Sequence, residues 1–171
     1  MTLIKTAAAV LLLLVTAACT NPDRFGGNAG AGGGLDANGG LAGSASDPSS
    51  PVYFNQTIGD RVLFAVNTST VTPEGQAILN GQAQWLLTNA DYRAVIEGHA
   101  DEQGTREYNL ALGFRRANAV REYLVSRGVP TDRLEVTSFG KERPVEICSQ
   151  EVCYAQNRRA VTVLSFSAIT S

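Results

Sequence analysis

The sequence has little of what nucleic-acid-binding proteins and most enzymes require. Its 171 residues carry fourteen Lys and Arg against sixteen Asp and Glu, a formal net charge of -2. Over residues 61–164 the balance is twelve basic and twelve acidic residues. Since no net field would attract phosphate groups, nucleic acid is excluded as a partner.

Histidine occurs once, at His99, and cysteine three times. There is no G-x-S-x-G elbow, and a single histidine without a nucleophile makes no catalytic triad. One enzyme hypothesis remains, because Glu97, His99 and Asp101 alternate along an extended segment and could hold a metal. No second histidine completes that shell. We therefore predict a non-catalytic protein without a cofactor and keep a metal-assisted hydrolase centred on His99 as the alternative.

Long apolar runs are missing except near the N-terminus, where residues 7–15 are too few to span a bilayer. Lys5 precedes this run and Ala17-Ala18-Cys19 follows it, which is typical of a signal peptide with a small-residue cleavage site. We therefore predict a signal peptide over residues 1–18. The alternative is a soluble secreted protein that is cut elsewhere.

Packing residues are scarce over residues 21–51, where Gly, Ala, Ser and Asn dominate. Nine glycines lie between Gly26 and Gly43. Such a composition cannot bury enough apolar surface to offset the entropy lost on ordering. We predict a flexible tether over residues 19–51, with an r.m.s. reach on the order of 30 Å, ahead of one domain over residues 52–171.

Periodicity in this domain predicts a mixed α+β fold. Thr72-Pro73 and Thr105 place a capping hydroxyl ahead of a helical pattern, so each is expected to begin a helix. Residues 52–54 are either a short strand or a packing segment. The order strand-helix-strand-helix-strand-strand predicts a two-layer sandwich, with two helices on one face of a mixed four-stranded sheet. The expected strands are 61–66, 92–97, 134–139 and 159–166, and the expected helices are 73–88 and 106–126.

Two charges near the middle of the chain are out of place for simple packing. Leu112, Arg116 and Val120 recur on one helical face, which puts a guanidinium within an apolar stripe. A buried charge needs a partner, and the nearest carboxylates are Asp101 and Glu102 in the preceding loop. Asp101 and Arg116 either form an internal ion pair or stay apart and bind a ligand with both an ammonium and a carboxylate.

Several separated motifs in this region resemble one known family. Their order and spacing are similar to those of the peptidoglycan-binding domain shared by outer membrane protein A and the peptidoglycan-associated lipoprotein, over about residues 61–164. No single motif is as specific as the set. The motifs are Gly98-His99-Ala100-Asp101, Tyr108-Asn109 with Leu112, Arg115-Arg116-Ala117 with Val120, and Asn157-Arg158-Arg159-Ala160-Val161.

The resemblance implies a ligand, the diaminopimelate side chain of peptidoglycan. Asp101 matches the family's aspartate that pairs with the ammonium, and Arg116 matches the arginine that binds the carboxylate. Asn109 matches an asparagine that either contacts the ligand or braces the loop. Lysine in place of diaminopimelate lacks the carboxylate, so we expect a strong preference for peptidoglycan of the diaminopimelate type.

The resemblance also implies that the loop after the first strand lines the same pocket. In the family this loop acts often through backbone groups, and Phe64, Ala65 and Asn67 occupy the matching positions. Ala65 and Val66 replace the more usual polar and aromatic residues. We expect Phe64, Ala65 and Asn67 to contact the ligand.

The N-terminal segment resembles a lipobox, Thr16-Ala17-Ala18-Cys19, with Thr16 where the family usually has Leu. This implies lipidation of Cys19, and several acyl chains would hold the protein on a membrane durably. Thr20 is not the aspartate that generally signals inner-membrane retention, so the implied location is the periplasmic face of the outer membrane. The lipoprotein branch of the family further implies a tether between outer membrane and cell wall. It also implies the Tol-Pal system, with TolB and TolA as partners and roles in cell division and envelope integrity.

Cys148 and Cys153 remain once Cys19 is assigned to the lipid anchor. They are close enough in sequence to close a small loop by a disulfide in an oxidising compartment. A metal-binding pair is the alternative, but no second pair or nearby histidine completes a zinc site. A disulfide here would staple a loop and take no part in chemistry.

Overall fold

The computed structural model describes residues 43–166. The predicted signal peptide over residues 1–18, the predicted lipidation site Cys19 and most of the predicted tether lie outside this range. Within it, no helix is both long and apolar enough to cross a membrane. The predictions for the N-terminal segments therefore stay predictions.

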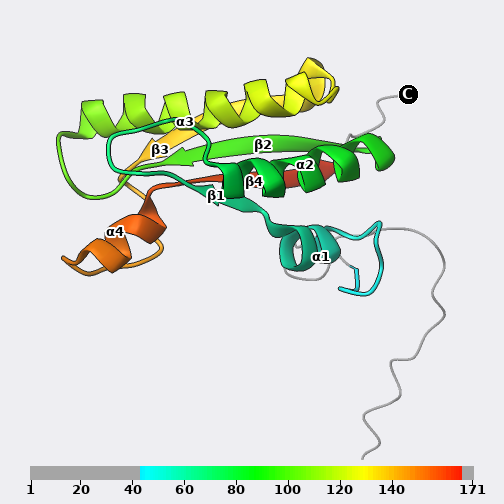
Figure 1. The fold of residues 1–171 in the computed structure, drawn as a ribbon, viewed down its shortest axis with the longest axis horizontal. Helices are drawn as coiled ribbons and strands as arrows, with labels where there is room; N and C mark the ends of the chain where they lie inside the picture. The colour runs from blue at the N-terminus through cyan, green and yellow to red at the C-terminus, as the bar shows by residue number, and fades with distance from the viewer. Residues whose placement is uncertain (1–42, 167–171) are drawn as a thin grey trace, which may run out of the picture. The chain divides into compact units, whose positions relative to one another are not determined.

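Four strands form one mixed sheet, and two long helices pack on one of its faces (Figure 1). The strands are β1 (Arg61–Leu63), β2 (Tyr92–His99), β3 (Leu134–Gly140) and β4 (Arg159–Phe166), and the helices are α2 (Pro73–Thr88) and α3 (Arg106–Ser126). Within the sheet the order is β1-β4-β2-β3. Strand β2 runs parallel to β3, whereas β4 is antiparallel to both β1 and β2. The predicted α+β sandwich is confirmed.

The helix starts follow from local capping. The Thr72 side chain accepts a hydrogen bond from the backbone N–H of Gly75 (3.2 Å), and the Thr105 side chain accepts one from Tyr108 (3.2 Å). Each bond satisfies one of the donors that a helix leaves free at its first turn. At the other end of α3, Gly128 takes a φ of +97°, a conformation that glycine adopts without a Cβ clash. Both predicted helices therefore have the expected bounds.

The core lies between the sheet and the two helices. Ala94 and Ile96 alternate with more exposed residues of β2 and are 1% and 0% exposed. They pack in one cluster with Leu86 of α2 and Val120 of α3. Complete burial of a side chain such as Ile96, Leu86 or Val120 stabilises the fold by about 1.5–3 kcal/mol.

The segment ahead of β1 is helical and packs against the domain. It comprises α1 (Pro51–Tyr53) and the π-helix η2 (Phe54–Gly59), so a strand over residues 52–54 is wrong and the packing interpretation is confirmed. The Phe54 ring is 5.0 Å from the ring of Trp85, whose Nε1 donates to the Pro48 carbonyl (2.7 Å). Packing therefore already involves residues ahead of position 52.

The sequence prediction differs from the structure in several other places. Strands β2 and β3 run on to His99 and Gly140, past their predicted ends at residues 97 and 139. Strand β1 ends at Leu63 and does not continue to Val66, because the chain turns there and the Thr68 N–H donates to the Ala65 carbonyl (3.3 Å). A short helix, α4 (Glu151–Asn157), lies where only a cysteine loop was expected, and a 3-10 turn, η3 (Thr131–Arg133), precedes β3.

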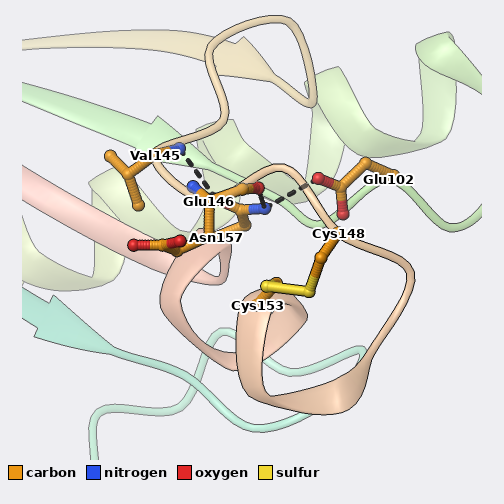
Figure 2. Close-up of a disulfide and its surroundings, with 6 residues drawn as sticks. All are labelled: Glu102, Val145, Glu146, Cys148, Cys153 and Asn157. Atoms are coloured by element: carbon orange, nitrogen blue, oxygen red, sulfur yellow. Dashed lines mark hydrogen bonds between the residues drawn. A yellow bond between two sulfur atoms is a disulfide. The ribbon is translucent and has the colours of Figure 1, made fainter.

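Cys148 and Cys153 are joined by a disulfide, with an S–S distance of 2.00 Å and a Cα–Cα distance of 5.9 Å (Figure 2). The chain just ahead of Cys148 is held by the side chain of Asn157, the last residue of α4. The Asn157 Oδ1 accepts hydrogen bonds from the backbone N–H groups of Val145 (2.9 Å) and Glu146 (3.2 Å). This disulfide-closed segment, residues 145–158, therefore has a defined backbone path.

Candidate ligand site at the end of strand β2

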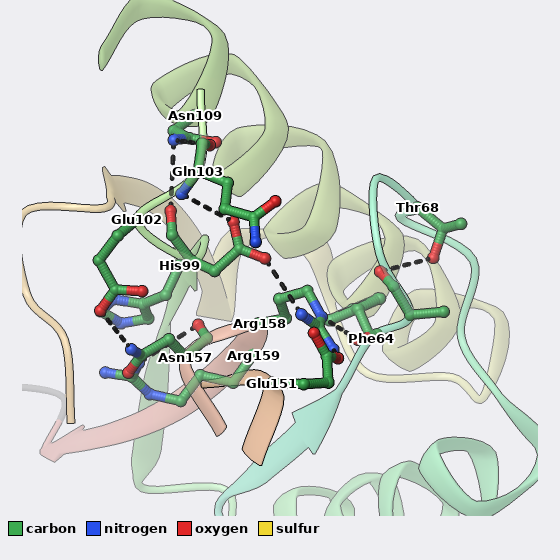
Figure 3. Close-up of polar contacts among 12 residues, drawn as sticks. Phe64, Thr68, His99, Glu102, Gln103, Asn109, Glu151, Asn157, Arg158 and Arg159 are labelled. Carbon is green, nitrogen blue, oxygen red and sulfur yellow. Dashed lines mark hydrogen bonds and ion pairs between the residues drawn. The ribbon is translucent and has the colours of Figure 1, made fainter. Parts of the chain in front are cut away.

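Segments that are distant in sequence meet where β2 ends. They are the loop after β1, the loop between β2 and α3, the middle of α3, and the junction of α4 with β4. Hydrogen bonds from two arginines, Arg116 and Arg158, join them. Figure 3 shows the Arg158 side of this meeting point, with Glu151 and Phe64 close to the guanidinium.

Two glycines bring α3 close enough to β2 to build the site. A Cβ atom at Gly98 would lie 1.8 Å from the Gly113 carbonyl oxygen, a backbone atom that cannot move aside. Register in the β2–β3 pair shifts between Gly98 and His99. Because Gly113 and Arg116 are one helical turn apart, this contact sets Arg116 over the end of the strand.

Arg116 is fully buried, with an exposed fraction of 0%. Its Nε donates to the Thr68 carbonyl (2.8 Å), its Nη1 to the His99 carbonyl (2.8 Å) and its Nη2 to the Ala65 carbonyl (3.2 Å). Burial lowers the pKa of Arg116 to about 10, and the nearby carboxylate of Asp101 opposes this shift. The guanidinium is therefore charged at neutral pH, and its charge is met by carbonyl oxygens.

These bonds use one N–H on each nitrogen of the guanidinium. Of the five N–H donors in the group, one on Nη1 and one on Nη2 have no acceptor within residues 43–166. A carboxylate can accept two hydrogen bonds from the two terminal nitrogens of one guanidinium. The loop after β1 supplies two of the three carbonyl acceptors, so it covers the arginine on that side.

Asp101 does not pair with Arg116. Its Oδ2 forms an ion pair with Nη1 of Arg158 (3.1 Å), and its Oδ1 accepts a hydrogen bond from the backbone N–H of Gln103 (3.2 Å). The hypothesis of an internal Asp101–Arg116 ion pair is therefore wrong. Each of the two charges is held by separate protein groups, and the charge of the Asp101 carboxylate acts on the pKa of Arg116 in the direction opposite to burial.

Asn109, 1% exposed, lies in the first turn of α3. Its Nδ2 donates to the carbonyls of Asp101 (3.3 Å) and Gln103 (2.7 Å). The amide thus ties the β2–α3 loop to the helix. Of the two roles that the sequence left open, the geometry favours the brace.

The three residues predicted in the loop after β1 differ in position. Phe64 is 4% exposed, its N–H donates to the Arg158 carbonyl (2.8 Å), and its own carbonyl accepts from Arg158 Nε (3.2 Å). Ala65 meets Arg116 through its carbonyl. Asn67 is exposed and has a φ of +55°, which asparagine tolerates better than most residues. The backbone of the loop is therefore brought to the arginines, whereas the Asn67 side chain is at the surface.

His99 has a packing role. It is 1% exposed, stacks on Phe139 with ring centroids 5.5 Å apart, and its Nε2 is 3.8 Å from Oε2 of Glu97. Burial, followed by the charges of Arg159 and Arg143, lowers its pKa to about 4. Within residues 43–166, no three His, Cys, Asp or Glu side chains are placed to hold a metal ion. The geometry gives no support to the metal hypothesis.

Sequence analysis missed the part that α4 has in this site. The motif that contains Arg158 gives this residue no role of its own, and nothing in the sequence pattern singles out Glu151. The Arg158 guanidinium also contacts the Glu151 carboxylate, and Nδ2 of Asn157 donates to Oε1 of Glu102 (2.7 Å). A spacing of seven between Glu151 and Arg158 is two helical turns, which could have indicated a shared face had the helix been expected.

Comparison with known proteins gives the family. A model described as the OmpA family matches residues 63–158. The peptidoglycan-associated lipoprotein of Brucella melitensis biotype 1 is 46% identical over 93% of this chain and 90% of its own length, and that of Rhizobium meliloti is 54% identical over 73% and 71%.

Solved structures agree with this grouping. The crystal structure of the peptidoglycan-associated lipoprotein from Burkholderia pseudomallei has a TM-score of 0.63 at 40% identity and covers 71% of this chain and 98% of that one. The C-terminal domain of Helicobacter pylori MotB, at 18% identity and a TM-score of 0.59 over 64% of this chain and 86% of that one, shares the fold. The chain therefore belongs to the OmpA family and, within it, to the peptidoglycan-associated lipoproteins.

Proposed function

We propose that this protein is a non-catalytic lipoprotein of the cell envelope that binds peptidoglycan through its diaminopimelate residue. The names of relatives at 40–54% identity support peptidoglycan association and the lipid anchor. The separate partners of Asp101 and Arg116 support the finer assignment. The single observation that carries it is that Asp101 and Arg116 are each held by other protein groups at the end of β2 and do not pair with each other.

Diaminopimelate ends in a carbon that carries both a free ammonium and a free carboxylate. In this proposal the ammonium binds the Asp101 carboxylate, and the carboxylate binds the remaining N–H groups on Nη1 and Nη2 of Arg116. A planar guanidinium suits a carboxylate in this two-bond arrangement. Asn109 and the backbone of Phe64 and Ala65 position the two charged groups.

Arg116 is enclosed, so the ligand carboxylate reaches it only if part of its cover shifts. The loop after β1 covers the guanidinium through the carbonyls of Ala65 and Thr68, which accept two hydrogen bonds from it, whereas the third acceptor, the His99 carbonyl, belongs to strand β2. Its residues Ala65, Val66 and Asn67 are exposed. We propose that this loop opens to admit the ligand, with Asn67 at its tip.

A ligand that lacks the carboxylate should bind poorly. Lysine in the same position of the peptide keeps the ammonium and loses the carboxylate, so opening the loop would bring no carboxylate to the arginine. The cost of leaving a charged donor pair without an acceptor is about 1–3 kcal/mol, which corresponds to about fivefold to 150-fold in affinity. The proposal therefore predicts discrimination between the two types of cell wall.

Sedimentation with isolated cell wall tests the proposal. The parent protein should sediment with wall of the diaminopimelate type, release no soluble fragments and be unaffected by a chelator. Asp101→Asn keeps the shape of the side chain and should abolish retention. Glu135→Gln removes the same charge from an exposed position on β3 and is the matched control. Retention of Asp101→Asn at the parent level would refute the role of Asp101, and chelator-sensitive release of fragments would point to a metal-assisted cell-wall hydrolase.

We further propose that Cys19 carries the lipid on the periplasmic face of the outer membrane, so that the protein joins this membrane to the wall. TolB and TolA are the proposed protein partners, in envelope integrity and cell division. If TolB docks over the ligand site, soluble TolB should release the parent protein from isolated wall in a dose-dependent way. Simultaneous binding of TolB and wall would contradict a shared surface.

A further inference from the structure

The disulfide-closed segment reaches the candidate ligand site in two places. Arg158, directly after α4, forms the ion pair with Oδ2 of Asp101 (3.1 Å), and Asn157 donates to Oε1 of Glu102 (2.7 Å). Asp101 and Glu102 are neighbours in the β2–α3 loop. The segment that carries the disulfide therefore holds the loop that presents the proposed ligand-binding carboxylate.

The Arg158 guanidinium is itself held from several directions. Its Nη2 contacts the Glu151 carboxylate, and its Nε donates to the Phe64 carbonyl (3.2 Å). The Arg158 side chain is 5% exposed, whereas that of Glu151 is 66% exposed. Because Glu151 and Arg158 stand at the two ends of α4, the path of this helix decides whether Arg158 can reach Asp101.

Helix α4 has little apolar packing to fix its path. It has seven residues, fewer than a helix needs to be stable by itself, and within it only Cys153 and Asn157 are buried. The apolar side chains of the segment point outward, since Val145, Ile147 and Val152 are 47%, 89% and 65% exposed. What holds the helix is the disulfide at its third residue and the polar contacts of Glu151, Asn157 and Arg158.

We infer that Arg158 is a positioning residue of the ligand site, set by the disulfide-closed helix α4, and that opening the Cys148–Cys153 bond weakens ligand binding. The inference rests on the proposed function, since it assumes that Asp101 meets the ligand. With the disulfide open, α4 loses its covalent closure and Arg158 no longer fixes the Asp101 carboxylate in one orientation.

The chemical step is a thiol–disulfide exchange with a dithiol. The dithiol gives up two electrons and closes into its own disulfide, while its two protons pass to the sulfur atoms of Cys148 and Cys153 as the S–S bond breaks. Ligand binding by this protein would then report the redox state of its surroundings. An oxidising compartment keeps the site in its high-affinity form.

Isothermal titration calorimetry tests this inference. The full-length chain in detergent is titrated with a soluble muropeptide that carries meso-diaminopimelate. Reduction with dithiothreitol should raise the Kd by about tenfold, with the number of sites per chain and the far-UV circular dichroism unchanged. The double variant Cys148→Ser/Cys153→Ser should show the same raised Kd with and without reductant. Glu151→Gln, which leaves the disulfide in place, should raise the Kd by a few fold through Arg158.

The outcomes separate the two proposals. If the oxidised parent does not bind the muropeptide, the proposed function fails. If it binds, and reduction leaves the Kd within twofold, the positioning role alone is wrong. A reduced chain that loses binding sites instead of affinity would show that the disulfide serves folding only, which also overturns the inference. A lysine-type muropeptide gives a further readout, since Asp101 meets the ammonium of both ligands and the ratio of their affinities should not change on reduction.

Discussion

Replacing Arg116 by methionine gives the sharpest test of the site. Methionine retains most of the side-chain volume, so the main change is the loss of three hydrogen bonds to backbone carbonyls. The carbonyls of Ala65 and Thr68 belong to a surface loop and can bind water instead. The His99 carbonyl is buried and would be left without its donor.

The magnitude follows from that one buried acceptor. An unsatisfied buried carbonyl costs about 1–3 kcal/mol, and removal of a desolvated charge offsets part of this cost. We expect Arg116→Met to lower the free energy of unfolding by about 2 kcal/mol, which for a domain of this size lowers Tm by roughly 6–12 °C. The variant should remain folded at 25 °C, because such domains are stable by about 5–15 kcal/mol.

Arg115→Met is the matched control. Arg115 precedes Arg116 on α3, is exposed, and has its guanidinium carbon 5.9 Å from the centre of the Tyr108 ring. Its replacement should change stability by less than about 0.5 kcal/mol and leave muropeptide binding intact. Thermal melts and titrations of the two variants would refute the reasoning if Arg116→Met melted like Arg115→Met, or if it kept the preference for diaminopimelate over lysine.

Two further predictions concern the supports of the site. Gly98→Ala should push α3 away from β2, since its Cβ would lie 1.8 Å from the Gly113 carbonyl oxygen, and should lower stability by more than about 3 kcal/mol. Gly81→Ala, whose Cβ would lie 3.0 Å from the Cγ2 methyl group of Ile58, should cost far less, and equal melts for the two would contradict the close-approach argument. For His99, the folded-state pKa of about 4 lies below the ordinary 6.5, so the neutral imidazole favours the folded state above pH 6.5 and this contribution is lost as pH falls toward 4. Denaturant melts between pH 7 and 4 should show a shallower loss of stability in His99→Leu than in the parent, and parallel curves would rule out His99 as the cause.

The long elements could be predicted from sequence because their signals are local. Thr105 caps α3 through the Tyr108 N–H, as its place ahead of the helical pattern predicts, and the helix ends at Ser126, two residues before Gly128. The register of apolar residues in β2 and β4 likewise predicts which face is buried. Short elements were harder: α4 has weak apolar periodicity because its helix is fixed by a disulfide and by Asn157, contacts that join residues beyond its own turns.

The candidate site could be predicted only in part. Asp101 and Arg116 stand out in the sequence because a charge within an apolar stripe must be satisfied by something. The pattern left open whether these two residues pair with each other. It gave no sign that Asp101 forms an ion pair with Arg158, or that Arg116 donates hydrogen bonds to three backbone carbonyls. The early end of β1 has the same origin, since the chain must turn after Phe64 to bring those carbonyls to Arg116.

By itself, the sequence determined the two long helices, the four-stranded sheet and the two charged residues of interest, because caps, periodicity and a misplaced charge are properties of neighbouring residues. The tertiary structure alone decided which groups those charges meet. Thr68 is 48 residues from Arg116, and Asp101 and Phe64 are 57 and 94 residues from Arg158. Only folding selects among the acceptors available to a guanidinium.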